Sequence, residues 1–133
     1  MTKKYLHEEL TSKIINCFYT VYNKLGYGFL EKVYENSLKL ELEKHGLSVE
    51  KQKPIKVYYE NKEVGEYFAD LIVENKIIIE IKAAESLCKE HELQIINYLK
   101  ATEIEIGLLL NFGKKPEIKR KIFSNNSTHK IHT

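Results

Sequence analysis

The 133-residue sequence has no tryptophan, one methionine, two prolines and two cysteines. Cys17 and Cys88 are far apart and neither belongs to a C-x-x-C pair, so we expect neither a disulfide scaffold nor a metal site made of cysteine alone. No apolar run approaches the roughly 20 residues that a membrane-spanning helix needs. The first residues lack the apolar segment of a signal peptide. We therefore expect a cytoplasmic protein with reduced thiols and no membrane partner.

The net charge of the chain is only +2, which by itself gives no argument for nucleic-acid binding. The C-terminal part is more basic, because residues 111–133 carry six lysine or arginine residues against one acid. A solvated surface explains such a cluster, and a weak attraction for phosphate groups is the alternative. The length fits one domain, which we expect at residues 1–123, followed by a polar C-terminal tail at 124–133.

Three segments have the spacing of amphipathic helices. Apolar residues recur every three or four positions at about 7–25 and 30–45, and helical spacing returns at about 88–101. Gly26 and Gly46 follow lysine-containing last turns and are predicted to end the first two helices.

The segment between the second and third helices changes to the period of strands. Three strands are predicted there, at Ile55–Tyr59, Tyr67–Val73 and Ile77–Lys82, with turns at 60–62 and 74–76. Pro54 predicts an edge strand or a strand start. A last buried strand is predicted at 104–111. The strands on either side of the third helix are expected to be parallel, because a helix crosses over between them.

Asp70 is the only aspartate among the 19 acidic residues, and it lies inside an apolar strand. Glu80 lies inside another, although a carboxylate on a buried sheet face is costly. A three-residue turn at 74–76 would place these two residues directly opposite each other, with Cβ atoms about 5 Å apart. Period two places Lys82 on the same face. A two-residue turn would break this register.

Two carboxylates at this distance repel each other unless a cation lies between them. An oxygen-rich pair with open positions for water suits Mg²⁺ or Mn²⁺. Lys82 beside them can orient a water molecule or stabilise developing negative charge. Together these groups are equipped for metal-assisted hydrolysis of a phosphate ester. The alternative is a simple ion pair between Lys82 and the acids.

Polar residues on two of the predicted helices are further candidates. Gln94 and Tyr98 are four residues apart on the third helix, with His91 one turn earlier, and this helix packs back over the sheet. Glu31 lies near the start of the second helix. Each has a structural alternative: an acid at a helix N-terminus for Glu31, a core tyrosine for Tyr98 and an ordinary surface histidine for His91.

Four motifs in this order resemble the GxxExxY proteins of the PD-(D/E)XK nuclease superfamily. Residues 28–34 read G-x-x-E-x-x-Y, Asp70 matches the metal-binding aspartate, and residues 80–82 match the E-x-K motif. Residues 94–98 match the Q-x-x-x-Y helix motif of related exonucleases, and residues 107–113 resemble the family's closing strand. The resemblance runs from about residue 7 to residue 123.

The resemblance implies an α/β fold of the restriction-endonuclease-like type, with an α-β-β-β-α-β core, a mixed sheet flanked by helices and an extra N-terminal helix. It also implies cleavage of DNA or RNA that depends on Mg²⁺ or Mn²⁺. Asp70, Glu80 and the carbonyl group of Ile81 would hold the metal. Glu31 would join the metal shell directly or through water.

The remaining motif residues are given catalytic roles by the same resemblance. Lys82 would position or activate the attacking water, and Gln94 and Tyr98 would orient the site or contact the substrate backbone. We therefore expect a metal-dependent nuclease with nucleic acid, in the first place DNA, as substrate. Because the chain is small and mildly basic, we expect a homodimer or a partner protein to complete the substrate channel. The alternatives are a catalytically silent nucleic-acid-binding module and a structural domain.

Overall fold

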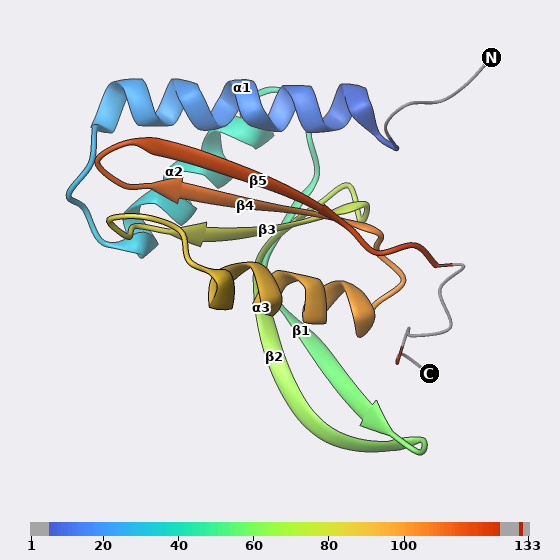
Figure 1. Cartoon of the computed structure of the whole chain (residues 1–133). Coiled ribbons are helices and arrows are strands. Elements are labelled where there is room, and N and C mark those ends of the chain that lie inside the picture. The colour runs from blue at the N-terminus through green and yellow to red at the C-terminus, as the bar shows by residue number, and fades with distance from the viewer. Residues whose placement is uncertain (1–5, 126–130, 132–133) are drawn as a thin grey trace.

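The computed structural model describes residues 6–125 and residue 131. In this part of the chain the elements are α1 (Glu8–Leu25), α2 (Glu31–Lys44), β1 (Val49–Tyr59), β2 (Lys62–Val73), β3 (Ile77–Lys82), α3 (Lys89–Lys100), β4 (Ile106–Phe112) and β5 (Pro116–Ile122). The strands form one sheet in the order β1-β2-β3-β4-β5. β3 and β4 are parallel, and the other neighbours are antiparallel. The expected α/β fold, with a mixed sheet and an extra N-terminal helix, is confirmed (Figure 1).

Helices cover both faces of the sheet, with α1 and α2 on one side and α3 on the other (Figure 1). The residues of β3 alternate between these sides. The α1 and α2 side receives Ile77, Ile79 and Ile81, whereas Ile78 packs on the α3 side. Because side chains alternate along a strand, Glu80 and Lys82 follow Ile78 onto the α3 side, as the sequence predicts.

The ends of the helices follow the predicted glycines. α1 ends at Gly26, whose φ is 69° and whose N–H donates to the carbonyl oxygen of Tyr22 at 2.8 Å. α2 ends at Lys44, and Gly46, with a φ of 81°, is the second residue after it. Both glycines have the positive φ that other residues adopt at a cost, which explains why the helices end there.

The hairpin of β1 and β2 is longer than the sequence predicts. Only Leu71, Ile72 and Val73 of β2 pair with β3, whereas the earlier part of β2 pairs with β1 alone. The two strands therefore leave the sheet together as an arm (Figure 1). Most of the β2 part of this arm is exposed, so its sequence lacks the apolar alternation of a half-buried strand. β1 is an edge strand, as Pro54 predicts.

The sequence pattern predicts no strand after residue 111, and here it is wrong, because β5 pairs antiparallel with β4. Charged residues dominate β5, which therefore has the sequence of a solvated surface. Two of its cations make contacts within the chain. A guanidinium nitrogen of Arg120 donates to the carbonyl oxygen of Leu6, and Lys121 pairs with Glu92. Part of the basic C-terminal cluster thus holds the fold together.

The predicted polar tail at 124–133 lies largely outside the described residues, which omit 126–130 and 132–133. Of its described residues, Asn125 donates its N–H to the carboxylate of Glu105, and Ile131 donates its N–H to the carbonyl oxygen of Lys100. The domain boundary at residue 123 stays a prediction. Within the described ranges, no helix has the length and apolar character needed to cross a membrane.

Candidate active site

Asp70 and Glu80 lie where β2 separates from β3. The ladder pairs Val73 with Ile77 and Leu71 with Ile79, so the predicted three-residue turn and its register are confirmed. Beyond this ladder, the backbone N–H groups of Asp70 and Ile81 donate to side-chain carboxylates. The N–H of Asp70 donates to Oε2 of Glu80 at 2.9 Å, and the N–H of Ile81 donates to Oδ2 of Asp70 at 2.8 Å. These hydrogen bonds explain how two acids are accommodated in apolar strands.

Glu35 is a third acid in this cluster, contributed by α2. It is buried, with 4% of its surface exposed. The side-chain amide nitrogen of Gln52, on β1, donates to Glu35 Oε1 at 3.2 Å and Oε2 at 3.1 Å, and to Oδ1 of Asp70 at 3.2 Å. One amide group therefore joins acids from α2 and β2. We call Glu35, Asp70 and Glu80 the acid cluster.

Gln52 reaches the acid cluster through an unusual backbone conformation. Its φ is 53°, in the left-handed region, although it lies within a strand. Lys51 and Lys53 on either side pair with Leu71 and Ala69, whereas Gln52 has no Cα partner in this ladder. A left-handed conformation costs a residue with a Cβ roughly 1–2 kcal/mol. Such local strain is typical of functional sites.

Burial raises the pKa of each carboxyl group of the acid cluster. For Glu80 the pKa is raised to about 8, first by burial and then by the charge of Asp70. Burial is also the leading cause of the raised pKa of Asp70 and of Glu35. Carboxylates this close repel each other, and Lys51, whose Nζ lies 4.0 Å from Oε2 of Glu35, together with Lys82 compensates part of their charge. The all-oxygen donor set of the acid cluster therefore fits a hard divalent cation such as Mg²⁺ or Mn²⁺.

Lys82 lies beside the acid cluster but is held by α3. Its Nζ donates to Oε1 of Gln94 at 3.2 Å, and Nε2 of Gln94 donates to the hydroxyl oxygen of Tyr98 at 3.0 Å. Its positive charge offsets part of the rise in the pKa of Asp70 and of Glu80. Among the described residues no ion pair joins Lys82 to either acid, so the simple ion-pair alternative does not describe this site.

Tyr98 and His91 have different positions on α3. Tyr98 is buried, and its hydroxyl pKa is raised first by burial and then by the charge of Glu80, so it lies within the field of the acid cluster. His91 accepts a hydrogen bond from the N–H of Cys88 at 3.2 Å and so caps the start of α3. The structure therefore favours a structural role for His91 as a hydrogen-bonded histidine at the start of α3.

Glu31 and Glu35 are one turn apart on α2. In the described part of the chain, Glu35 is the one of the two that Gln52 links to Asp70. Glu31 is exposed at the first position of the helix. Its place in the metal shell stays a prediction, as does ligation by the carbonyl group of Ile81. Sequence reasoning missed Glu35. The available signal was its position next to the buried Tyr34, because a core-facing helix buries a stripe about 100° wide and not a single row.

The G-x-x-E-x-x-Y motif has a structural explanation. The hydroxyl of Tyr34 donates to the carbonyl oxygen of Gly26 at 2.6 Å and accepts from the N–H of Phe29 at 3.2 Å. Its ring stacks on Phe112 of β4, with 4.4 Å between ring centroids. Gly28 in the same loop has a φ of 112°. The motif thus fixes the loop between α1 and α2 on the end of the sheet.

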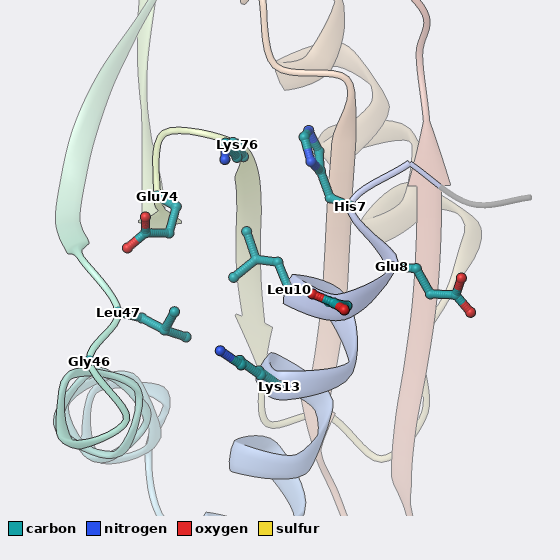
Figure 2. Close-up of a pocket in the computed structure, with 9 residues that line it drawn as sticks. His7, Glu8, Leu10, Lys13, Gly46, Leu47, Glu74 and Lys76 are labelled. Carbon is teal, nitrogen blue, oxygen red and sulfur yellow. The ribbon is translucent and has the colours of Figure 1, made fainter. Parts of the chain in front are cut away.

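Three hollows lie beside α3 and at the two ends of β3, and none of the three is lined by a residue of the acid cluster. One of about 510 Å³ beside α3 is lined in part by Tyr67, Gln94 and Tyr98. Another of about 500 Å³ lies at the C-terminal ends of β3 and β4 and is lined in part by Phe29 and residues 83–84. The third, of about 510 Å³, lies at the opposite end of β3 (Figure 2). Because Gln94 accepts a hydrogen bond from Lys82, the hollow beside α3 is the one joined to the candidate site.

Comparison with known proteins gives one match. A family model for the PD-(D/E)XK nuclease superfamily matches residues 8–121. This range contains the whole acid cluster, Gln52, Lys82, and Gln94 and Tyr98 of α3. No significant match to the chain is found among curated proteins or among solved structures.

Proposed function

Because the chain belongs to the PD-(D/E)XK nuclease superfamily, we propose that it is a divalent-metal-dependent nuclease that hydrolyses phosphodiester bonds of nucleic acid, in the first place DNA. Within the superfamily we assign it to the GxxExxY proteins on the basis of residues 28–34. The observation that carries the proposal is the acid cluster at the separation of β2 from β3, with Lys82 beside it.

The residues present fit a hard cation such as Mg²⁺ or Mn²⁺. Asp70 and Glu80 would hold it, together with the carbonyl group of Ile81. Glu35, which Gln52 links to Asp70, would lie beside it. Glu31 would act through water from the start of α2. When bound, such an ion supplies Lewis-acid stabilisation of phosphoryl oxygens and lowers the pKa of a nearby water.

Lys82 would provide the positive charge that faces the reacting phosphate. Its ammonium group is oriented by Gln94, which Tyr98 in turn holds. A donor fixed in this way acts on negative charge that develops in the transition state without first having to reorganise. Gln94 and Tyr98 are therefore proposed as positioning residues.

Gln52 would tune the site from the β1 side. Its amide nitrogen lies between the carboxylates of Glu35 and Asp70, where it offsets part of their repulsion. Rotation of the amide by half a turn would present its oxygen to the same place. The strained backbone of Gln52 supports a role at the site over a role in stability.

Exposed aromatic side chains on both sides of the acid cluster support an unpaired strand as substrate. Tyr27 and Phe29 are 58% and 48% exposed at one hollow, and Tyr67 and Phe68 are 52% and 48% exposed on β2 just before Asp70. Stacking on such rings is how single-stranded nucleic acid is commonly bound, because every base offers a π-face. A homodimer or a partner protein in the cytoplasm would extend this short surface.

The experiment is a cleavage assay on labelled single-stranded DNA, duplex DNA and RNA, with Mg²⁺, with Mn²⁺ and with chelator. We expect metal-dependent cleavage, fastest on single-stranded DNA, which falls about 100-fold or more in Lys82→Ala. Lys76→Ala is the matched control, because Lys76 is an exposed lysine at the other end of β3. Metal-insensitive binding without cleavage would instead identify a silent binding module, and cleavage that survives in Lys82→Ala would contradict the assignment of the site.

A further inference from the structure

A second group of metal-binding side chains lies between α1 and α2, away from the acid cluster. Cys17 comes from α1, and Glu41 and His45 come from the last turn of α2 and the residue after it. A ligand atom of each lies within 4.8 Å of the other two. We call these residues the mixed cluster, because they offer one sulfur, one nitrogen and one carboxylate oxygen.

Two of the three ligand-to-ligand distances within the mixed cluster are close to those of a tetrahedral site, and the third is within 4.8 Å. Sγ of Cys17 lies 3.7 Å from Nδ1 of His45, and this nitrogen lies 3.6 Å from Oε2 of Glu41. Zinc bonds of about 2.3 Å to sulfur and 2.0–2.2 Å to nitrogen and oxygen, at tetrahedral angles, place the ligand atoms about 3.4–3.6 Å apart. The three side chains are therefore arranged to accept an ion with little movement.

The end of α2 favours a cation at this place. The backbone N–H of His45 donates to the carbonyl oxygen of Leu42, so it does not pair with the carbonyl oxygen of Glu41. That oxygen instead accepts from Nδ1 of His45 at 2.9 Å and lies 4.0 Å from Sγ of Cys17. Unpaired carbonyl groups give the C-terminus of a helix a partial negative charge. The carboxylate of Glu41 adds a full negative charge, and its side chain is 12% exposed.

The mixed cluster also has a route to solvent. The side chain of His45 is 51% exposed, whereas Cys17 is buried, with 2% of its surface exposed. An ion can thus enter from the His45 side and keep a water as its fourth ligand. Sulfur and imidazole ligands select borderline-soft ions such as Zn²⁺ over Mg²⁺, which prefers an all-oxygen site.

We propose that Cys17, Glu41 and His45 bind a transition-metal cation, with Zn²⁺ as the best fit, and that the bound ion clamps α1 to α2. Coordination replaces the S–H bond of Cys17 by a metal–sulfur bond, and the proton passes to solvent. Nδ1 of His45 also gives up its proton to solvent, and Nε2 takes up a proton so that the imidazole stays neutral. The hydrogen bond from Nδ1 to the Glu41 carbonyl is then replaced by the metal–nitrogen bond. No oxidation or reduction is involved.

The test is titration of the full chain with Co²⁺, followed by displacement with Zn²⁺. We expect the visible bands of four-coordinate Co²⁺ and a thiolate-to-cobalt charge-transfer band. Cys17→Ser should remove the charge-transfer band. Even partners outside the metal shell are worth about 10- to 100-fold in affinity, so His45→Ala should weaken Zn²⁺ binding about 100-fold or more. Glu41→Gln should weaken it as well.

The control is the pair Cys88→Ser and His91→Ala, because Cys88 is the exposed thiol and His91 is its histidine neighbour on α3. We expect this variant to retain both the bands and the affinity. Since His45 is half exposed, His45→Ala should fold even if the buried Cys17→Ser does not. Unchanged Zn²⁺ affinity in His45→Ala, or loss of the bands in the α3 control, would overturn the proposal.

Discussion

α2 contributes to two groups of ligand atoms, and they differ in chemistry and in origin. The acid cluster contains only oxygen ligands, lies where two strands separate, and has Glu35 and Glu80 buried. The mixed cluster contains sulfur, nitrogen and oxygen and opens to solvent at the end of a helix. Glu35 and Glu41 are six residues apart, which turns them about 240° around the helix axis. One helix therefore serves two sites that do not share a ligand.

Because the two clusters differ in their donor atoms, we expect them to prefer different ions. Buried carboxylates repel each other and gain most from a small, hard cation. A thiol and an imidazole group gain most from a borderline-soft cation. The two clusters should therefore bind different metals in the same molecule, and changes in one should leave the other intact.

The largest effects should come from changes that remove one site and spare the other. Asp70→Asn should abolish Mn²⁺ binding at the acid cluster, measured by calorimetry. A neutral amide then replaces the carboxylate that accepts hydrogen bonds from Gln52 and from the N–H of Ile81. The same variant should keep its Co²⁺ bands. His45→Ala should show the reverse. If Asp70→Asn also removed the Co²⁺ bands, the two clusters would not be independent sites.

A paired change on α2 tests which helix acid belongs to the active site. Glu35→Gln should lower the rate of metal-dependent cleavage about 10- to 100-fold, as expected for a partner of the metal ligands. Glu31→Gln, one turn earlier and exposed, removes a group that would act only through water, so the rate should fall less than in Glu35→Gln. Equal losses in the two variants would mean that Glu31 belongs to the metal shell as much as Glu35 does.

Gln52 gives a smaller and more specific effect. Gln52→Leu removes the amide while keeping the size of the side chain, so Mn²⁺ affinity measured by calorimetry should fall about tenfold. Gln52→Glu supplies an oxygen ligand in the same place and should retain Mn²⁺ binding better than Gln52→Leu. An affinity in Gln52→Leu equal to that of the unchanged protein would limit Gln52 to a structural role.

The two clusters also differ in how far the sequence predicts them. Asp70 and Glu80 could be placed together because a short turn fixes the register between neighbouring strands. The facing of Gln94 toward Tyr98 follows from helix periodicity alone. Both inferences use contacts that are close in sequence, and both are confirmed by the hydrogen bonds of these residues.

The missed features depend on contacts between distant segments. Gln52 reaches the acid cluster only because β1 extends back to Val49 and adopts a left-handed residue in mid-strand, which nothing local in the sequence requires. β5 is held by pairing with β4, although its own residues resemble a surface segment. The mixed cluster depends on the packing of α1 against α2. In each case tertiary contacts override the local pattern.

The burial of acids in the acid cluster should appear in the pH dependence of stability. In the folded protein the pKa of Glu80 is raised to about 8 from an ordinary value of 4.5. Between these pH values the folded state retains a proton that the unfolded state has lost. The free energy of unfolding should therefore fall as pH rises through this range, since stability decreases wherever the folded state binds more protons. The raised pKa values of Asp70 and Glu35 act in the same direction.

Denaturant unfolding of the metal-free protein at a series of pH values measures this slope. Glu80→Gln, which is neutral at every pH, should flatten it and should stabilise the protein most at the alkaline end. Glu31→Gln is the exposed control and should leave the slope in place. Mg²⁺ should restore stability at alkaline pH in the unchanged protein but not in Glu80→Gln. A slope as steep in Glu80→Gln as in the unchanged protein would mean that Glu80 is ionised in the metal-free protein, so the acid cluster would then be compensated by Lys82 and its neighbours without a metal. A smaller remaining slope is expected from Asp70 and Glu35.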